Sequence, residues 1–75
     1  MNDKIKNIMA SVFDVKADGI NDNSSPDSIA NWDSMKHIDL VLSLEEEFNL
    51  EFDEKEISEM MSFSNIKKII NDKLN

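Results

Sequence analysis

The chain has 75 residues, a formal net charge of −8, one histidine and no cysteine. This length allows a single domain over residues 1–75, and an apolar content of 40% is too high for a typical disordered segment. The missing cysteines exclude disulfides and thiolate metal sites, and the short apolar runs predict neither a membrane span nor a signal peptide, so we expect a cytoplasmic protein.

The negative charge is concentrated in one part of the chain. Between Asp33 and Glu59 there are ten acidic residues and only two lysines, whereas the remainder holds six of each. Such a segment can form a solvated acidic face or a docking surface for basic partners, and charge alone does not decide between them. Nucleic acid is not an expected partner, because its phosphates would be repelled.

The first predicted helix covers residues 3–13. Its apolar positions recur at i, i+3, i+4 and i+7, which is the pattern of one buried helix face. These positions are Ile5, Ile8, Met9 and Val12.

A long loop is predicted next, from Asp14 to Asp33, because glycine, asparagine, serine and proline punctuate this stretch. About twenty residues without regular structure is unusual in a compact domain and is typical of functional or disordered loops. Four apolar residues are expected to anchor the loop to the core, namely Val15, Ile20, Ile29 and Trp32.

The second predicted helix, residues 34–48, has a broad apolar stripe that suits the central helix of a bundle. The stripe comprises Met35, Ile38, Val41, Leu42 and Phe48, widened by Leu40 and Leu44.

Two further helices follow. Asp53 and Glu56 resemble a capping pair that starts a short helix over residues 54–60, with Ile57 and one of the two following methionines facing inward. Ser62 is a plausible cap for a last helix over residues 63–74. Its expected core residues are Phe63, Ile66, Ile69, Ile70 and Leu74. The predicted fold is therefore all-α, a small four-helix bundle with three main helices, a short third helix and a long first loop.

Ser34 lies where the long loop meets the second helix. Serine is common at helix starts, so its position alone indicates only a structural role. A nucleophilic role is disfavoured, because Asp39 cannot easily orient His37 and no glycine-flanked turn surrounds the serine. We therefore do not expect an esterase, and His37 is expected to be exposed on the surface. No metal site is expected either, since the acidic stretch after Glu51 has neither the glycine nor the alternating ligands of a calcium loop.

The sequence resembles the acyl carrier protein family over essentially its full length. The resemblance rests on Asn31-Trp32-Asp33-Ser34-Met35, on Ile38-Asp39-Leu40-Val41 and on Leu44-Glu45-Glu46-Glu47-Phe48. The family's attachment motif, Asp-Ser followed by Leu or Met, reads Asp33-Ser34-Met35 here.

The resemblance implies a carrier of acyl thioesters that does no chemistry itself. A phosphopantetheinyl transferase would attach 4'-phosphopantetheine from coenzyme A to Ser34, and acyl-transferring or condensing enzymes with basic surfaces would dock on the carrier, which is expected to be a monomer. The expected partner-binding residues are Asp33, Met35, Asp39, Glu45 and Glu46.

Three positions depart from the family pattern. Lys36 stands where an acid is frequent, Asn31 where glycine is common, and Glu51-Phe52 occupies the region of a usual proline. A specialised carrier for polyketide, lipid or polysaccharide modification therefore fits as readily as the fatty-acid carrier. Two alternatives stay open: an unmodified acidic interaction module, and an aminoacyl or peptidyl carrier.

Overall fold

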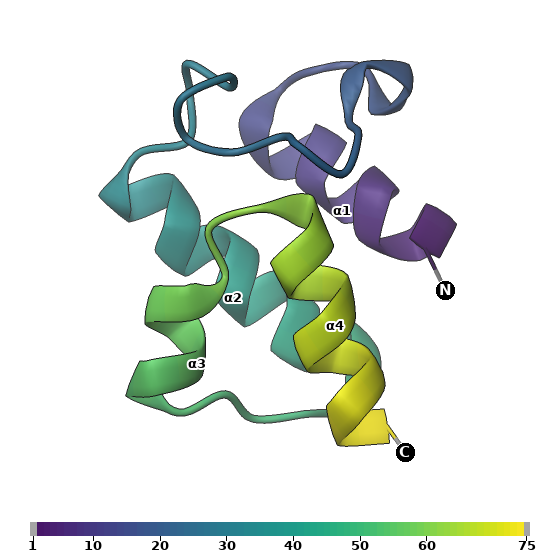
Figure 1. The fold of residues 1–75 in the computed structure, drawn as a ribbon, viewed down its shortest axis with the longest axis vertical. Helices are drawn as coiled ribbons and strands as arrows, with labels where there is room; N and C mark the ends of the chain where they lie inside the picture. The colour runs from purple at the N-terminus through teal and green to yellow at the C-terminus, as the bar shows by residue number, and fades with distance from the viewer. Residues whose placement is uncertain (1, 75) are drawn as a thin grey trace.

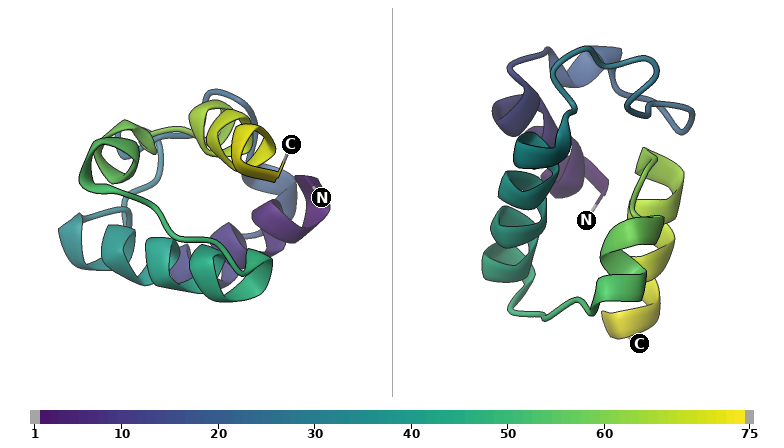
Figure 2. Two further views of the ribbon diagram at one scale, coloured as in Figure 1. Left: turned by 90° about the horizontal axis from the view of Figure 1, so that it is seen from below. Right: turned by 90° about the vertical axis from the view of Figure 1, so that its left-hand side faces the viewer.

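The computed structural model describes residues 2–74, and this part contains four α-helices, one short 3-10 turn and no strand. In chain order the elements are α1 (Asn2–Phe13), η1 (Ala17–Gly19), α2 (Ser34–Phe48), α3 (Glu54–Glu59) and α4 (Phe63–Leu74). Helix α2 packs against α1 and runs along one side of the bundle. Helices α3 and α4 lie on the opposite side, and the long connection crosses one end (Figures 1 and 2). The predicted all-α bundle is confirmed.

Side-chain caps set the helix starts where the sequence predicts them. The Asp33 carboxylate accepts a hydrogen bond from the Lys36 amide at 2.8 Å, which opens α2. Asp53 and Glu56 form a complete capping box at α3. The Ser62 hydroxyl accepts from the Asn65 amide at 3.1 Å, just before α4. Each cap satisfies an amide that has no acceptor inside its own helix.

The core is formed by apolar side chains from every α-helix except α3, together with residues from the connections. The buried apolar residues are Ile5, Met9, Phe13, Ile20, Ile29, Trp32, Leu40, Val41, Leu44, Phe52, Met60, Phe63, Ile66 and Ile70. Ile8, Val12, Phe48, Ile57 and Ile69 pack against this core from its edges. Two residues expected to be buried, Val15 and Leu74, are exposed. Val15 lies just after the end of α1, and Leu74 is the last residue of α4.

The buried face of α2 differs from the predicted stripe. His37, Leu40, Val41 and Leu44 face inward, whereas Met35, Ile38 and Leu42 are exposed. The buried set follows i, i+3, i+4 and i+7 once the histidine is included in it. The prediction was wrong because it treated His37 as a surface residue. The predicted apolar face was therefore displaced by part of a turn around the helix from the face that is buried.

The long connection is held by hydrogen bonds to α1 and α4. The Asn31 side chain donates to the Phe13 carbonyl at 2.8 Å, and the Phe63 amide donates to the Ser24 carbonyl at 3.1 Å. Trp32 stacks on Phe13 with ring centroids 4.7 Å apart. The predicted anchors Ile20, Ile29 and Trp32 are buried, and η1 is a short regular turn in a stretch expected to have none.

Candidate functional site

Ser34 is the first residue of α2, and its side chain is exposed at the end of the helix that the long connection reaches. The preceding residue, Asp33, provides the cap. The Ser34 and Met35 amides belong to the first helical turn and have no acceptor within the helix. The positive end of the helix dipole therefore lies beside the hydroxyl, which favours a bound anion there.

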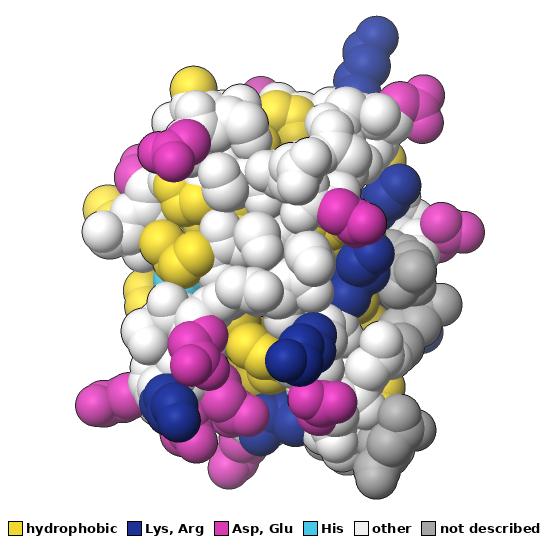
Figure 3. All heavy atoms as spheres, in the orientation of Figure 1, with side chains coloured by type: hydrophobic (Ala, Val, Ile, Leu, Met, Phe, Trp, Pro, Cys, Tyr) yellow, Lys and Arg dark blue, Asp and Glu magenta, His cyan; other side chains and the backbone are white. Residues whose placement is uncertain are grey.

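A hollow of about 510 Å³ adjoins Ser34. We call it the Ser34 groove, and its lining residues are Pro26, Trp32, Asp33, Ser34, His37, Ile38 and Met61. In the space-filling view, hydrophobic side chains gather on the left of the molecule, and the only histidine just shows between them (Figure 3). The groove thus places the Ser34 hydroxyl beside a mainly apolar surface.

His37 is not the exposed residue that the sequence predicted, because only 9% of it is accessible. Its Nδ1 accepts a hydrogen bond from the Trp32 indole Nε1 at 3.0 Å, and its Nε2 lies 2.8 Å from the Ile57 carbonyl oxygen. An indole nitrogen can only donate, so Nδ1 is unprotonated and Nε2–H donates to the carbonyl. Burial is tolerated because both nitrogens have partners. Neither nitrogen is available to act as a base toward Ser34.

The five residues expected to contact partners lie on or beside α2. Asp33, Met35, Asp39 and Glu46 are exposed. Glu45 is half-buried, and its carboxylate accepts a hydrogen bond from the Phe52 amide at 2.9 Å, which fixes the link after α2. Ile38 and Leu42, on the same helix, are also about half exposed. The prediction from sequence placed these two residues in the core stripe, so it did not identify them as surface residues.

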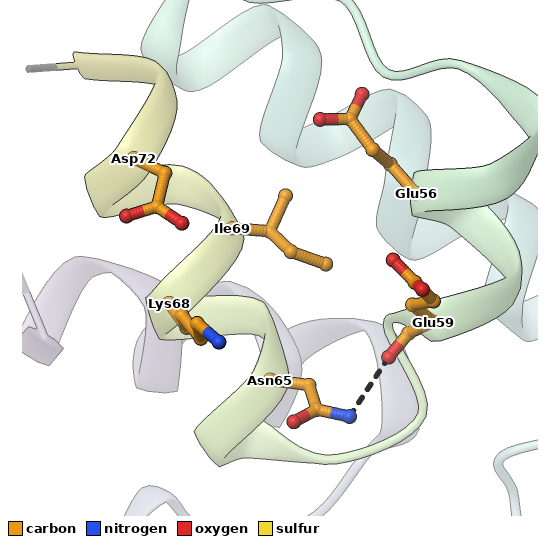
Figure 4. A pocket seen from close by; sticks show the side chains of 6 residues that line it. All are labelled: Glu56, Glu59, Asn65, Lys68, Ile69 and Asp72. Atoms are coloured by element: carbon orange, nitrogen blue, oxygen red, sulfur yellow. Dashed lines mark hydrogen bonds between the residues drawn. The ribbon is translucent and has the colours of Figure 1, made fainter.

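A second hollow, of about 380 Å³, lies between α3 and α4. Its lining residues are Glu56, Glu59, Asn65, Lys68, Ile69 and Asp72, with Asn65 donating to the Glu59 carbonyl (Figure 4). The lining mixes charges of both signs and lacks Ser34. The Ser34 groove is therefore the better candidate for a functional site.

Comparison with known proteins agrees with this geometry. A family model described as "Phosphopantetheine attachment site" matches residues 3–71. An acyl carrier protein from Chlamydia caviae is 30% identical over 66 residues, which cover 88% of this chain and 86% of the relative. This chain belongs to the acyl carrier protein family. One from Picosynechococcus sp. is 41% identical over 49 residues, or 65% of this chain and 60% of that relative.

The protein is thus an acyl carrier whose cofactor is 4'-phosphopantetheine. The residues present fit this group, because an exposed hydroxyl lies beside two helix-terminal amides and next to a mainly apolar groove. No helix within residues 2–74 has the length and apolar character needed to cross a bilayer.

The acidic segment should make this acyl carrier more stable in salt. The molecule measures 29 × 23 × 20 Å, and the Debye length falls from about 30 Å at 0.01 M to about 8 Å at 0.15 M ionic strength, so repulsion across the fold is screened over this range. We expect the melting temperature to rise by about 4–8 °C, which corresponds to about 1 kcal/mol for a domain of this size.

Thermal unfolding at several sodium chloride concentrations measures this effect. The double variant Glu54→Gln/Glu59→Gln, which removes two exposed acids of the segment, should show a smaller rise. A melting temperature that does not change from low to moderate salt would show that repulsion contributes little.

Proposed function

We propose that Ser34 carries the phosphopantetheine arm of this acyl carrier and that the chain does no chemistry itself. The observation that supports this proposal is the position of the Ser34 hydroxyl, exposed at the start of α2 and beside the groove. When bound, the cofactor supplies a terminal thiol that holds acyl groups as thioesters.

The residues around Ser34 have separate roles in this proposal. Ser34 provides the tether oxygen, and the Asp33 cap holds the helix start in place so that the first-turn amides face the attached phosphate. The Asp33 charge opposes this phosphate, so the net gain from the helix dipole is small. Both His37 nitrogens are occupied, so His37 is not the base that activates Ser34, and in this proposal a phosphopantetheinyl transferase supplies the base.

Partner enzymes are proposed to dock on the exposed face of α2. Asp33, Asp39 and Glu46 would meet basic residues, and Met35 would supply apolar contact, since 81% of it is accessible. Glu45 would contribute charge while retaining its bond to the Phe52 amide. Complementary charge of this kind raises encounter rates and weakens with salt.

We further propose that a specialised pathway suits this carrier as readily as fatty-acid synthesis does. Lys36 places a positive charge two residues after Ser34, and Asn31 binds the end of α1 instead of giving the flexibility of glycine. Transfer of malonyl groups by the host's fatty-acid malonyl transferase tests this point, because efficient transfer would contradict a dedicated side pathway. The cytoplasmic location and the monomeric state stay predictions.

Mapping the modified residue tests the proposed attachment. The purified chain is incubated with coenzyme A and a phosphopantetheinyl transferase, and the product is fragmented in a mass spectrometer. We expect one phosphopantetheine per chain, on the fragment that contains Ser34. No mass gain with several transferases would instead favour the unmodified interaction module.

A further inference from the structure

His37 has a structural position that the attachment of the cofactor does not explain. It lies one helical turn after Ser34 and lines the Ser34 groove, yet it is buried. Through its two ring nitrogens it connects Trp32, just before α2, to the Ile57 carbonyl in α3. The imidazole and indole rings are also stacked, with centroids 6.1 Å apart and planes inclined by 23°.

The hydrogen bond from His37 to the Ile57 carbonyl joins α2 to α3 beside the groove, and the bond from Trp32 holds the imidazole in place. An alkyl chain that passed between the two helices here would displace the imidazole and leave the Trp32 N–H and the Ile57 carbonyl without partners. Unpaired polar groups are strongly disfavoured in a protein interior. The interior side chains Leu40, Leu44 and Met60 have no accessible surface, so they would have to move as well.

The groove itself offers a shallower place for cargo. Pro26, Ile38 and Met61 present apolar surface beside Ser34, and Ile38 and Met61 are 51% and 43% accessible. A short or polar acyl group loses little by lying there in contact with water. A long alkyl chain loses more, because each methylene left in water forgoes the gain from burial.

We propose that His37 is a specificity-determining residue that keeps the acyl group in the Ser34 groove and out of the helix bundle. The carrier then favours short or polar acyl groups over long alkyl chains. This inference rests on the proposed attachment of the cofactor to Ser34 and names the class of cargo that the same site carries.

The experiment compares short and long cargo on four versions of the full chain. Wild type, His37→Ala, Trp32→Phe and the control Lys36→Ala, which changes an exposed neighbour, are each loaded from acetyl- or octanoyl-coenzyme A by a transferase that accepts both. Intact mass establishes loading. The half-life of the thioester in hydroxylamine then reports burial of the cargo, and NMR follows the Trp32 indole N–H and the methyl groups of Leu44 and Ile70.

In wild type and Lys36→Ala, the acetyl and octanoyl forms should have similar half-lives, unchanged core methyl signals and an intact indole signal. In His37→Ala, the octanoyl thioester should live about 5- to 30-fold longer than in wild type, and the core methyl signals should move. This factor corresponds to removing a free-energy cost of about 1–2 kcal/mol for burying the chain between the helices. Trp32→Phe retains an aromatic ring but lacks the donor, so a smaller increase is expected even if His37→Ala does not fold.

Two results would overturn the inference while leaving the attachment intact. One is an octanoyl group that shifts the core methyl signals of Leu44 and Ile70 in wild type. The other is octanoyl protection in Trp32→Phe no greater than in wild type. If wild type and all three variants gain no mass, the attachment to Ser34 is contradicted, and the inference about His37 no longer has a basis.

Discussion

Ser34→Ala is expected to abolish phosphopantetheine loading completely while leaving the fold unchanged. No other hydroxyl in the chain combines the family motif, a helix start and the neighbouring groove. The stability should change by no more than about 0.5 kcal/mol, because Ser34 is exposed and the cap of α2 is supplied by Asp33. Intact mass after incubation with transferase and coenzyme A measures loading, and urea unfolding measures stability.

Ser64→Ala is the matched control for this experiment. Ser64 is likewise exposed and lies in the first turn of α4, so its removal should leave both loading and stability close to those of wild type. Residual loading of the Ser34→Ala variant, at any other serine, would show that the attachment residue had been assigned wrongly.

Leu44→Ala is expected to be the more damaging of two leucine substitutions on α2. Leu44 has no accessible surface, and removing a buried leucine side chain costs about 2.7–5 kcal/mol through lost burial and the cavity left behind. A domain of this size has a total stability of only about 3–5 kcal/mol, so this variant should be largely unfolded near physiological temperature.

Leu42→Ala provides the comparison on the same helix. Leu42 is 57% accessible, so its truncation should cost less than about 1 kcal/mol. Urea unfolding followed by helical circular dichroism distinguishes the two variants. Equal losses of stability would mean that the buried face of α2 had been assigned wrongly.

The helices of this fold could be predicted from the sequence because their signals are local. Asp53, Glu56 and Ser62 mark helix starts through contacts three residues apart, and α2 begins and ends as predicted. The short helix α3 ends one residue earlier than expected, with Met60 rather than Met61 as the inward methionine.

The buried face of α2 could not be predicted in the same way. Whether His37 can be buried depends on Trp32 and on the Ile57 carbonyl, which lies 20 residues away along the chain. The periodicity of His37 with Leu40, Val41 and Leu44 was a usable signal, but it required a polar residue to be counted as part of a core face. The Ser34 groove could not be predicted for the same reason, because its lining residues come from three segments that are separated along the chain.

Helix α3 differs from its neighbours in one respect that affects how the molecule opens. None of its residues is buried, and the polar contacts that link it to α4 are the ion pair between Glu56 and Lys73 and the exposed hydrogen bond from Asn65 to the Glu59 carbonyl. Its attachment to α2 includes the single hydrogen bond from the histidine ring to the Ile57 carbonyl. Amide hydrogens of α3 should therefore exchange with solvent well before those of α1, α2 and α4, through a partial opening of one wall of the bundle while the remaining helices stay folded.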